Sequence, residues 1–290
     1  MTKNLILIIT ILIALLLSSC KVQNNSESNN YKANSEAWVK LLDQDLSKWE
    51  VWTGVPEKSV ENLPETYNSN ASGENKEPIG LGDPLKIFQL EQGDNGELTL
   101  NISGEVYAGL TTLETYSNYH MTLLIKWGEK KYEPRLDRKR DNGLLYHCHG
   151  EHGAFWDVWM SSLEYQIQEE DFGDLYVLAG TSAKVLVNEN NRWDPNSQIF
   201  AEKHCENSKD AELPHGHWNR VDLYVLGDKA IHVTNGEVVL ALSDAKNKNG
   251  EILNSGKIQI QSEAAECYMK DIRIRPITKF PAELKKIAKL

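Results

Sequence analysis

Carboxylate and carboxamide side chains share one face of a predicted strand near the middle of the chain. Successive strand residues point to opposite faces, so residues 163–168 have one apolar face and one polar face. The apolar face carries Leu163, Tyr165 and Ile167, and the polar face carries Glu164, Gln166 and Gln168. Glutamine is not a favoured strand residue. Its repetition beside Glu164 therefore indicates a surface that hydrogen-bonds hydroxyl groups, although a solvated outer face is the alternative.

Two further segments carry the same kind of pattern. In residues 256–261 the aliphatic Ile258 and Ile260 alternate with Lys257, Gln259 and Gln261 on the opposite face, and we expect Lys257 and Gln259 to face a ligand. In residues 142–149 the side chains of His147 and His149 fall on one face, and the pattern does not decide which face points inward. Either histidine could donate a hydrogen bond or bind a divalent metal, but two ligands do not make a site, and both could equally be surface residues.

Two tryptophans precede the strand that carries Glu164. Trp156 and Trp159 flank Asp157 in a predicted loop, and aromatic faces stack on the apolar face of a sugar ring. Core packing is the alternative for each of them. We expect Trp49 and Trp127, which lie in apolar segments, to belong to the core.

The elements that must position these residues are short strands. Alternating segments separated by turn residues occur at 96–102, 118–127, 142–149, 162–169, 175–178, 218–226, 230–234, 237–242 and 256–261. Asn235-Gly236 predicts a type I′ hairpin turn between two of them. Long loops at 53–84, 130–141 and 188–214 are expected to shape a binding face. The pattern predicts an all-β sandwich of mostly antiparallel strands.

The two ends of the chain differ from this domain. Residues 1–19 have the layout of a lipoprotein export signal that ends at Cys20, the predicted site of lipidation. Polar residues 20–37 predict a flexible tether, residues 38–278 a single domain, and residues 279–290 a basic C-terminal tail. These features predict a bacterial cell envelope protein held at a membrane by its lipid, either periplasmic or surface-exposed.

Charge and cysteine content limit the partners. The net charge of −11 argues against nucleic acid and leaves neutral carbohydrate open. After lipidation of Cys20 three cysteines remain, so at most one disulfide can form. At least one of Cys148, Cys205 and Cys267 is therefore expected to be a buried free thiol.

Taken in order, several motifs resemble the 3-keto-disaccharide hydrolase family over nearly all of residues 38–276. They are Asp45-Leu46-Ser47-Lys48-Trp49, Gly109-Leu110-Thr111-Thr112, Asp141-Asn142-Gly143-Leu144-Leu145-Tyr146, Leu163-Glu164-Tyr165-Gln166-Ile167, His217-Trp218-Asn219, Asn235-Gly236 and the run from Gly256 to Glu263. The resemblance implies a jelly-roll of two antiparallel sheets, of the concanavalin A-like lectin and glucanase type, with sugar on the concave sheet. Many members of this family are exported lipoproteins.

The resemblance also implies a reaction. The ketone of a 3-keto-glycoside acidifies the C2 proton, so one base can form an enolate that expels the C1 substituent, and water then adds to the enone. Glu164 is the expected base, and Gln166 and Asn142 are among the expected sugar contacts. Many members have an Arg where this chain has His147, which here is expected to stabilise the enolate oxygen.

Conventional hydrolysis is a second route to the same products. It needs two carboxyl groups about 5–5.5 Å apart, and Glu164 and Glu169 can meet only across a β-bulge. The leading prediction is an enzyme that cleaves 3-keto-glycosides, with no certain cofactor and a divalent metal as an open option. The rival is a non-catalytic carbohydrate-binding module on the same sandwich. A purely structural lipoprotein is a third option.

Overall fold

The computed structural model describes residues 38–65, 67 and 76–290, which lie within one compact unit. Cys20, the predicted signal and the predicted tether lie outside the described residues. Within the described part, no helix is both long and apolar enough to cross a membrane.

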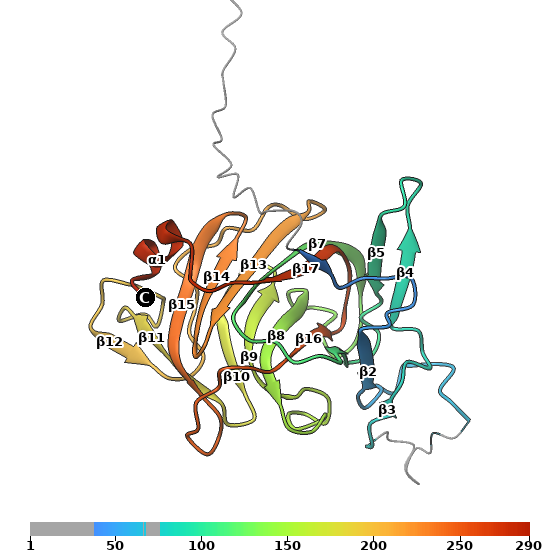
Figure 1. The fold of residues 1–290 in the computed structure, drawn as a ribbon. Coiled ribbons are helices and arrows are strands. Elements are labelled where there is room, and N and C mark those ends of the chain that lie inside the picture. The colour runs from blue at the N-terminus through green and yellow to red at the C-terminus, as the bar shows by residue number, and fades with distance from the viewer. Residues whose placement is uncertain (1–37, 66, 68–75) are drawn as a thin grey trace, which may run out of the picture. The chain divides into compact units, whose positions relative to one another are not determined.

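The described residues form two sheets whose strand pairs are all antiparallel (Figure 1). The ten-stranded sheet has the order β12 (Ile199–Ala201), β11 (Ser182–Val187), β15 (Glu237–Lys246), β14 (Lys229–Thr234), β13 (Asn219–Leu226), β7 (Tyr119–Lys131), β17 (Ala265–Pro276), β5 (Leu98–Ile102) and β4 (Phe88–Gln92), with β1 (Val39–Lys40) also paired to β17. The seven-stranded sheet has the order β10 (Leu175–Leu178), β9 (Ser161–Gln168), β8 (Asp141–His149), β16 (Lys257–Ser262), β6 (Ala108–Thr112), β2 (Trp49–Thr53) and β3 (Gly80–Leu81).

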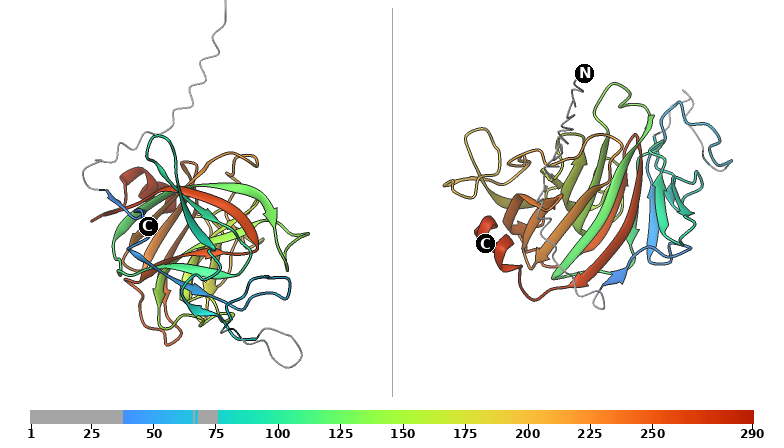
Figure 2. Two further views of the ribbon diagram at one scale, coloured as in Figure 1. Left: turned by 90° about the vertical axis from the view of Figure 1, so that its right-hand side faces the viewer. Right: turned by 90° about the horizontal axis from the view of Figure 1, so that it is seen from above.

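The main core lies between the two sheets, which Figure 2 shows as layers. Leu163, Tyr165 and Ile167 of β9 face this core, as the alternation predicts. All nine predicted segments coincide with strands, so the all-β prediction is confirmed. The predicted hairpin joins β14 to β15, where Asn235 and Gly236 have φ values of 50° and 87°.

One central strand, β17, was not predicted from the sequence. Its inward residues alternate up to Met269, but Asp271 takes a left-handed conformation with φ of 53°. The register with β7 shifts between Lys270 and Arg273. The bulge moves the apolar positions by one residue, so a period of two no longer fits the whole strand.

The segment predicted as a basic tail contains helix α1 (Ala282–Ala288). Leu284 and Ala288 are buried in the main core, and α1 contacts β15 (Figure 1). Its apolar face is therefore part of the folded domain.

The buried cysteines and tryptophans agree with expectation. Cys148, Cys205 and Cys267 are all buried and free, and Trp49 and Trp127 are both buried in the main core. The three thiols therefore serve as small apolar core groups.

Candidate active site

A cavity of ≈ 230 Å³ lies on the face of the seven-stranded sheet that points away from the main core. Glu164, Gln166 and Gln168 of β9 all line it, so the predicted polar face is a recessed surface. The neighbouring strands β8, β10 and β16 and the loops before and after β8 supply the other walls. Strand pairing places these side chains, because residues opposite each other on adjacent strands share a face.

Glycine at position 143 makes room for two of the polar side chains. A Cβ at Gly143 would overlap Oε1 of Glu164 and Oε1 of Gln261. The missing side chain on β8 thus lets groups from β9 and β16 meet above the middle of the sheet. Any larger residue would displace one of them.

Glu164 is a buried carboxyl group in a cluster of like charges. It is 5% exposed, and burial raises its pKa well above the usual range, helped by the nearby carboxyls of Glu263 and Asp141. A hydrogen bond with Gln261 opposes this shift only in part. Burial and the nearby like charges therefore favour the protonated form of Glu164.

The two other carboxyls share one guanidinium. Arg135, from the loop between β7 and β8, lies 2.6 Å from Asp141 Oδ2 and 3.2 Å from Glu263 Oε1. Burial raises the pKa of both carboxyls, and Arg135 lowers it. A hydrogen bond from Asp141 also favours the ionised form of Glu263. One positive charge cannot compensate two buried negative charges, so this pair retains a proton near neutral pH.

Two carboxamide oxygens in the cavity have no partner among the described residues. They are Oε1 of Gln166 and Oε1 of Gln261, and both side chains are buried. The Gln166 amide donates to Asp141 Oδ1 at 2.9 Å, which leaves its oxygen directed elsewhere. Buried acceptors normally have donors, so these oxygens fit the hydroxyl groups of a sugar.

Aromatic side chains of the loop between β8 and β9 complete the cavity. Trp159 is 1% exposed and packs in a second apolar core on this sheet, whereas Trp156 is 65% exposed. Phe155 stacks on Trp156 at a centroid distance of 4.7 Å. Both tryptophans line the cavity, Trp159 as a fixed wall and Trp156 at the exposed rim. The conformation of Trp156, with φ of 54°, is unusual for a bulky residue.

Two predicted sugar contacts do not line the cavity. The side chain of Asn142 points toward the main core, because its neighbours in β8, Asp141 and Gly143, lie on the cavity face of the sheet. Its amide donates a hydrogen bond to the Gln261 carbonyl at 2.6 Å. The side chain of Gln259 lies on the cavity face of the sheet, but the loop after β8 covers it. It accepts a hydrogen bond from Met160 N and donates one to Thr111 Oγ1. It positions that loop rather than a ligand.

The predicted histidine and lysine contacts also lie elsewhere. A bulge in β8 turns His147 away, with φ of 53°, and its buried ring lies beside the backbone of Gly227 and Ser255. Burial lowers its pKa to about 4. His149 Nδ1 is 2.9 Å from the His147 carbonyl oxygen. Lys257 pairs with Glu50 at 2.6 Å. In the described region, no three acidic, histidine or cysteine side chains are arranged to hold a metal.

Several cavity residues were not among the contacts predicted from the sequence. The alternation placed Gln261 on the polar face of its strand, and Glu263 continues that face just after β16, so extending the period by one step would have found Glu263. Asp141 lies two residues from Gly143 on the same face. For Arg135 the sequence offered no signal beyond its place in a long loop. Glu169, the possible second carboxyl for conventional hydrolysis, forms an ion pair with Arg140 at 2.8 Å and does not line the cavity with Glu164.

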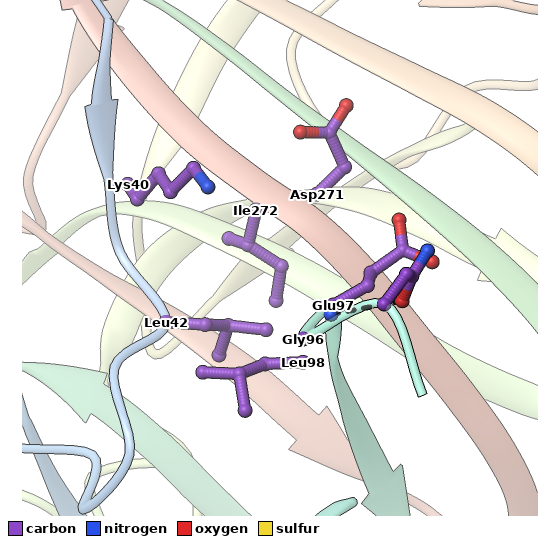
Figure 3. Close-up of a pocket in the computed structure, with 8 residues that line it drawn as sticks. Lys40, Leu42, Gly96, Glu97, Leu98, Asp271 and Ile272 are labelled. Carbon is purple, nitrogen blue, oxygen red and sulfur yellow. Dashed lines mark hydrogen bonds between the residues drawn. The ribbon is translucent and has the colours of Figure 1, made fainter. Parts of the chain in front are cut away.

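A larger hollow of ≈ 300 Å³ lies at the bulge of β17 (Figure 3). Lys40, Glu97 and Asp271 surround its rim, with Leu42, Leu98 and Ile272 beneath them. No aromatic side chain and no group of buried carboxyls is among these described residues. It lacks the features that favour the first cavity.

Comparison with known proteins gives one match to a family and several to solved structures. The family model of the 3-keto-alpha-glucoside-1,2-lyase-like domain matches residues 37–275. Two structures from Parabacteroides distasonis ATCC 8503, both provisionally described as glycosyl hydrolases, are 16% and 15% identical, with TM-scores of 0.48 and 0.44. The first alignment covers 84% of this chain and 95% of the other, and the second 83% and 99%.

The carbohydrate-binding module CBM66 of Bacillus subtilis is 7% identical, with a TM-score of 0.41, and the alignment covers 65% of this chain and 91% of that one. No curated protein matches the chain. Because the family match spans most of the described domain, the chain belongs to the family of the 3-keto-alpha-glucoside-1,2-lyase-like domain.

Proposed function

We propose that this protein cleaves the glycosidic bond of 3-keto-glycosides in the cavity beside Glu164. The observation that carries the proposal is a group of three buried carboxyls, two of which share the Arg135 guanidinium, next to two carboxamide oxygens without a partner among the described residues. Such perturbed groups in a recess are typical of acid–base chemistry. The family supports a carbohydrate as the substrate.

The keto group sets what the protein must supply. A base removes the C2 proton, the resulting enolate expels the C1 oxygen substituent, and water adds to the enone. This elimination needs one proton acceptor and one proton donor, whereas direct displacement at C1 needs a defined spacing of two carboxyls. Burial favours the protonated form of Glu164, whereas the Arg135 guanidinium favours negative charge on Asp141 and Glu263.

The cavity volume favours a single ring as the buried unit. A space of ≈ 230 Å³ lies below the roughly 300–1,000 Å³ of pockets that hold drug-sized ligands. We therefore expect one keto-sugar ring inside the cavity and the C1 substituent at the rim, beside the exposed Trp156.

Substitution of Glu164 tests the proposal. The wild-type protein is expected to release methanol from a methyl 3-keto-glucoside, and Glu164→Gln to lower kcat for this substrate by roughly 100-fold or more while binding of the keto-sugar persists. Absence of turnover by the wild-type protein, with or without added divalent metal, would contradict the enzyme proposal. Calorimetric binding without turnover would instead support the carbohydrate-binding alternative, which the exposed Phe155–Trp156 stack favours.

We also propose that the protein is exported and lipid-anchored through Cys20. The support is the apolar run from Leu5 to Leu17 followed by Ser18-Ser19-Cys20. Cys20→Ala is expected to move the protein from the membrane fraction to the soluble fraction. Equal membrane association of both forms would reject the anchor.

A further inference from the structure

We propose that Glu263 is the base that takes the C2 proton, and that Glu164 is the acid that protonates the departing oxygen. Asp141 and Arg135 act as positioning residues for Glu263. This assignment rests on the proposed function and reverses the role that the sequence suggested for Glu164.

Within the Asp141–Glu263 pair, the contacts distinguish the proton donor from the proton acceptor. Asp141 Oδ1 accepts from Gln166 at 2.9 Å, and Oδ2 lies 2.6 Å from Arg135. Asp141 also donates a hydrogen bond to Glu263, whose Oε1 lies 3.2 Å from Arg135. Asp141 therefore holds the proton of the pair, and Glu263 is the carboxylate that can receive one from a substrate.

The charges around Glu263 favour a role as a base. Glu263 faces Arg135 from the loop before β8, Asp141 from β8, Glu164 from β9 and Tyr107 before β6. Burial raises the pKa of Glu263 to about 7, and Arg135 and the hydrogen bond from Asp141 oppose this rise by favouring the ionised form. A base is most effective with a pKa near the working pH.

Glu164 has no comparable partner. No basic group lies within ion-pair distance of it among the described residues, and its hydrogen-bonded neighbour is the neutral Gln261. Both features favour the protonated form of Glu164, which is the form that a proton donor needs. Glu164 lies over Gly143 and lines the same cavity as Trp159, so its carboxyl faces the space that a sugar ring would occupy.

The protons balance over a full turnover. Glu263 takes the C2 proton, the C2–H electrons form the enolate, and the C1–O bond breaks as its oxygen takes the proton of Glu164. Water then adds across the enone: the Glu164 carboxylate removes a proton as hydroxide bonds to C1, and Glu263 returns its proton to C2. Both carboxyls end in their starting states, and no oxidant or reductant is consumed.

The roles can be separated with two leaving groups and one exchange measurement. We would compare methyl and 4-nitrophenyl 3-keto-α-glucosides, and follow C2 hydrogen exchange in deuterated water by NMR. Glu263→Gln is expected to lose roughly 100-fold or more of the turnover of both substrates, together with C2 exchange. Glu164→Gln is expected to retain C2 exchange and to lose at least roughly 100-fold with the methyl glycoside but under 10-fold with the nitrophenyl glycoside, whose phenolate leaves without an acid.

A matched control is Glu169→Gln. Glu169 directly follows β9, forms an ion pair with Arg140 and does not line the cavity. Its rates are expected to stay within about twofold of the wild type. If Glu263→Gln does not fold, Glu263→Asp retracts the carboxylate by one methylene and should lower exchange and turnover together.

The pH profile tests the positioning role of Arg135. The rising limb of kcat/KM reports ionisation of the base, so Arg135→Gln should move it to higher pH by at least about 0.5 unit. Loss of C2 exchange in Glu164→Gln, or its retention in Glu263→Gln, would overturn the assignment while leaving the proposed function intact. Failure of the wild-type protein to turn over either glycoside would instead remove the proposed function itself.

Discussion

At the residue scale, a missing side chain shapes the site as much as the charged ones do. Gly143 allows Glu164 and Gln261 to meet over β8. Neighbouring Asn142, only one residue away, points to the opposite side and bonds the Gln261 carbonyl. One position along a strand therefore separates a cavity residue from a core residue.

Gly143→Ala tests this crowding directly. The added methyl would overlap two cavity side chains, so overpacking should cost about 1–3 kcal/mol of stability. Displacement of Glu164 by about 1 Å should lower kcat/KM by roughly 100-fold. The check is a kinetic assay at a temperature where thermal unfolding shows the variant folded. Near-wild-type activity would mean that the carboxyl need not occupy its observed place.

At the scale of elements, the loop between β8 and β9 carries both a buried and an exposed tryptophan. Trp159 packs with Leu145, Cys148 and Leu178 in a core of its own. Gln259 holds the loop through Met160 N at 3.2 Å. The loop is thereby fixed to the sheet, and Trp156 is presented at its exposed tip.

The two tryptophans form a matched pair of substitutions. Trp159→Ala should cost about 3–5 kcal/mol in urea unfolding because the side chain is 1% exposed. Trp156→Ala, at 65% exposed, should change stability by under about 0.5 kcal/mol and raise KM roughly 3–10-fold through lost stacking. An unchanged KM in Trp156→Ala would remove this residue from the binding surface.

At the scale of the whole molecule, both sheets enclose the main core, and the seven-stranded sheet also carries the cavity. One face of the seven-stranded sheet closes the main core, and its other face carries the cavity. The ten-stranded sheet supplies the opposite wall of the core and receives α1 on β15. Stability and chemistry thus depend on opposite faces of the same strands.

A pair of substitutions in α1 tests whether the C-terminal segment belongs to the domain. Leu284→Ala should destabilise by about 2–5 kcal/mol, since Leu284 is 2% exposed. Ile287→Ala is the control: Ile287 is 50% exposed and should lose less than about 0.5 kcal/mol. Equal urea midpoints for the two variants would show that the helix contributes little to the fold.

The sequence alone determined the strands that alternate without interruption and the polar face of β9. Leu163, Tyr165 and Ile167 entered the core and Glu164, Gln166 and Gln168 lined a recess, because a period of two assigns faces locally. The hairpin at Asn235-Gly236 was equally local, since it requires only two residues that tolerate positive φ.

Which distant residues meet in the cavity depends on the packing of the whole domain. Arg135, Asp141 and Glu263 come from a loop, a strand start and the end of another strand, and no spacing in the chain reveals their contact. Bulges reversed the faces of His147 in β8 and of the residues after Asp271 in β17. The face on which a side chain lies in a regular strand follows from the alternation of neighbouring residues. Bulges and contacts between distant segments depend instead on how the whole sheet packs.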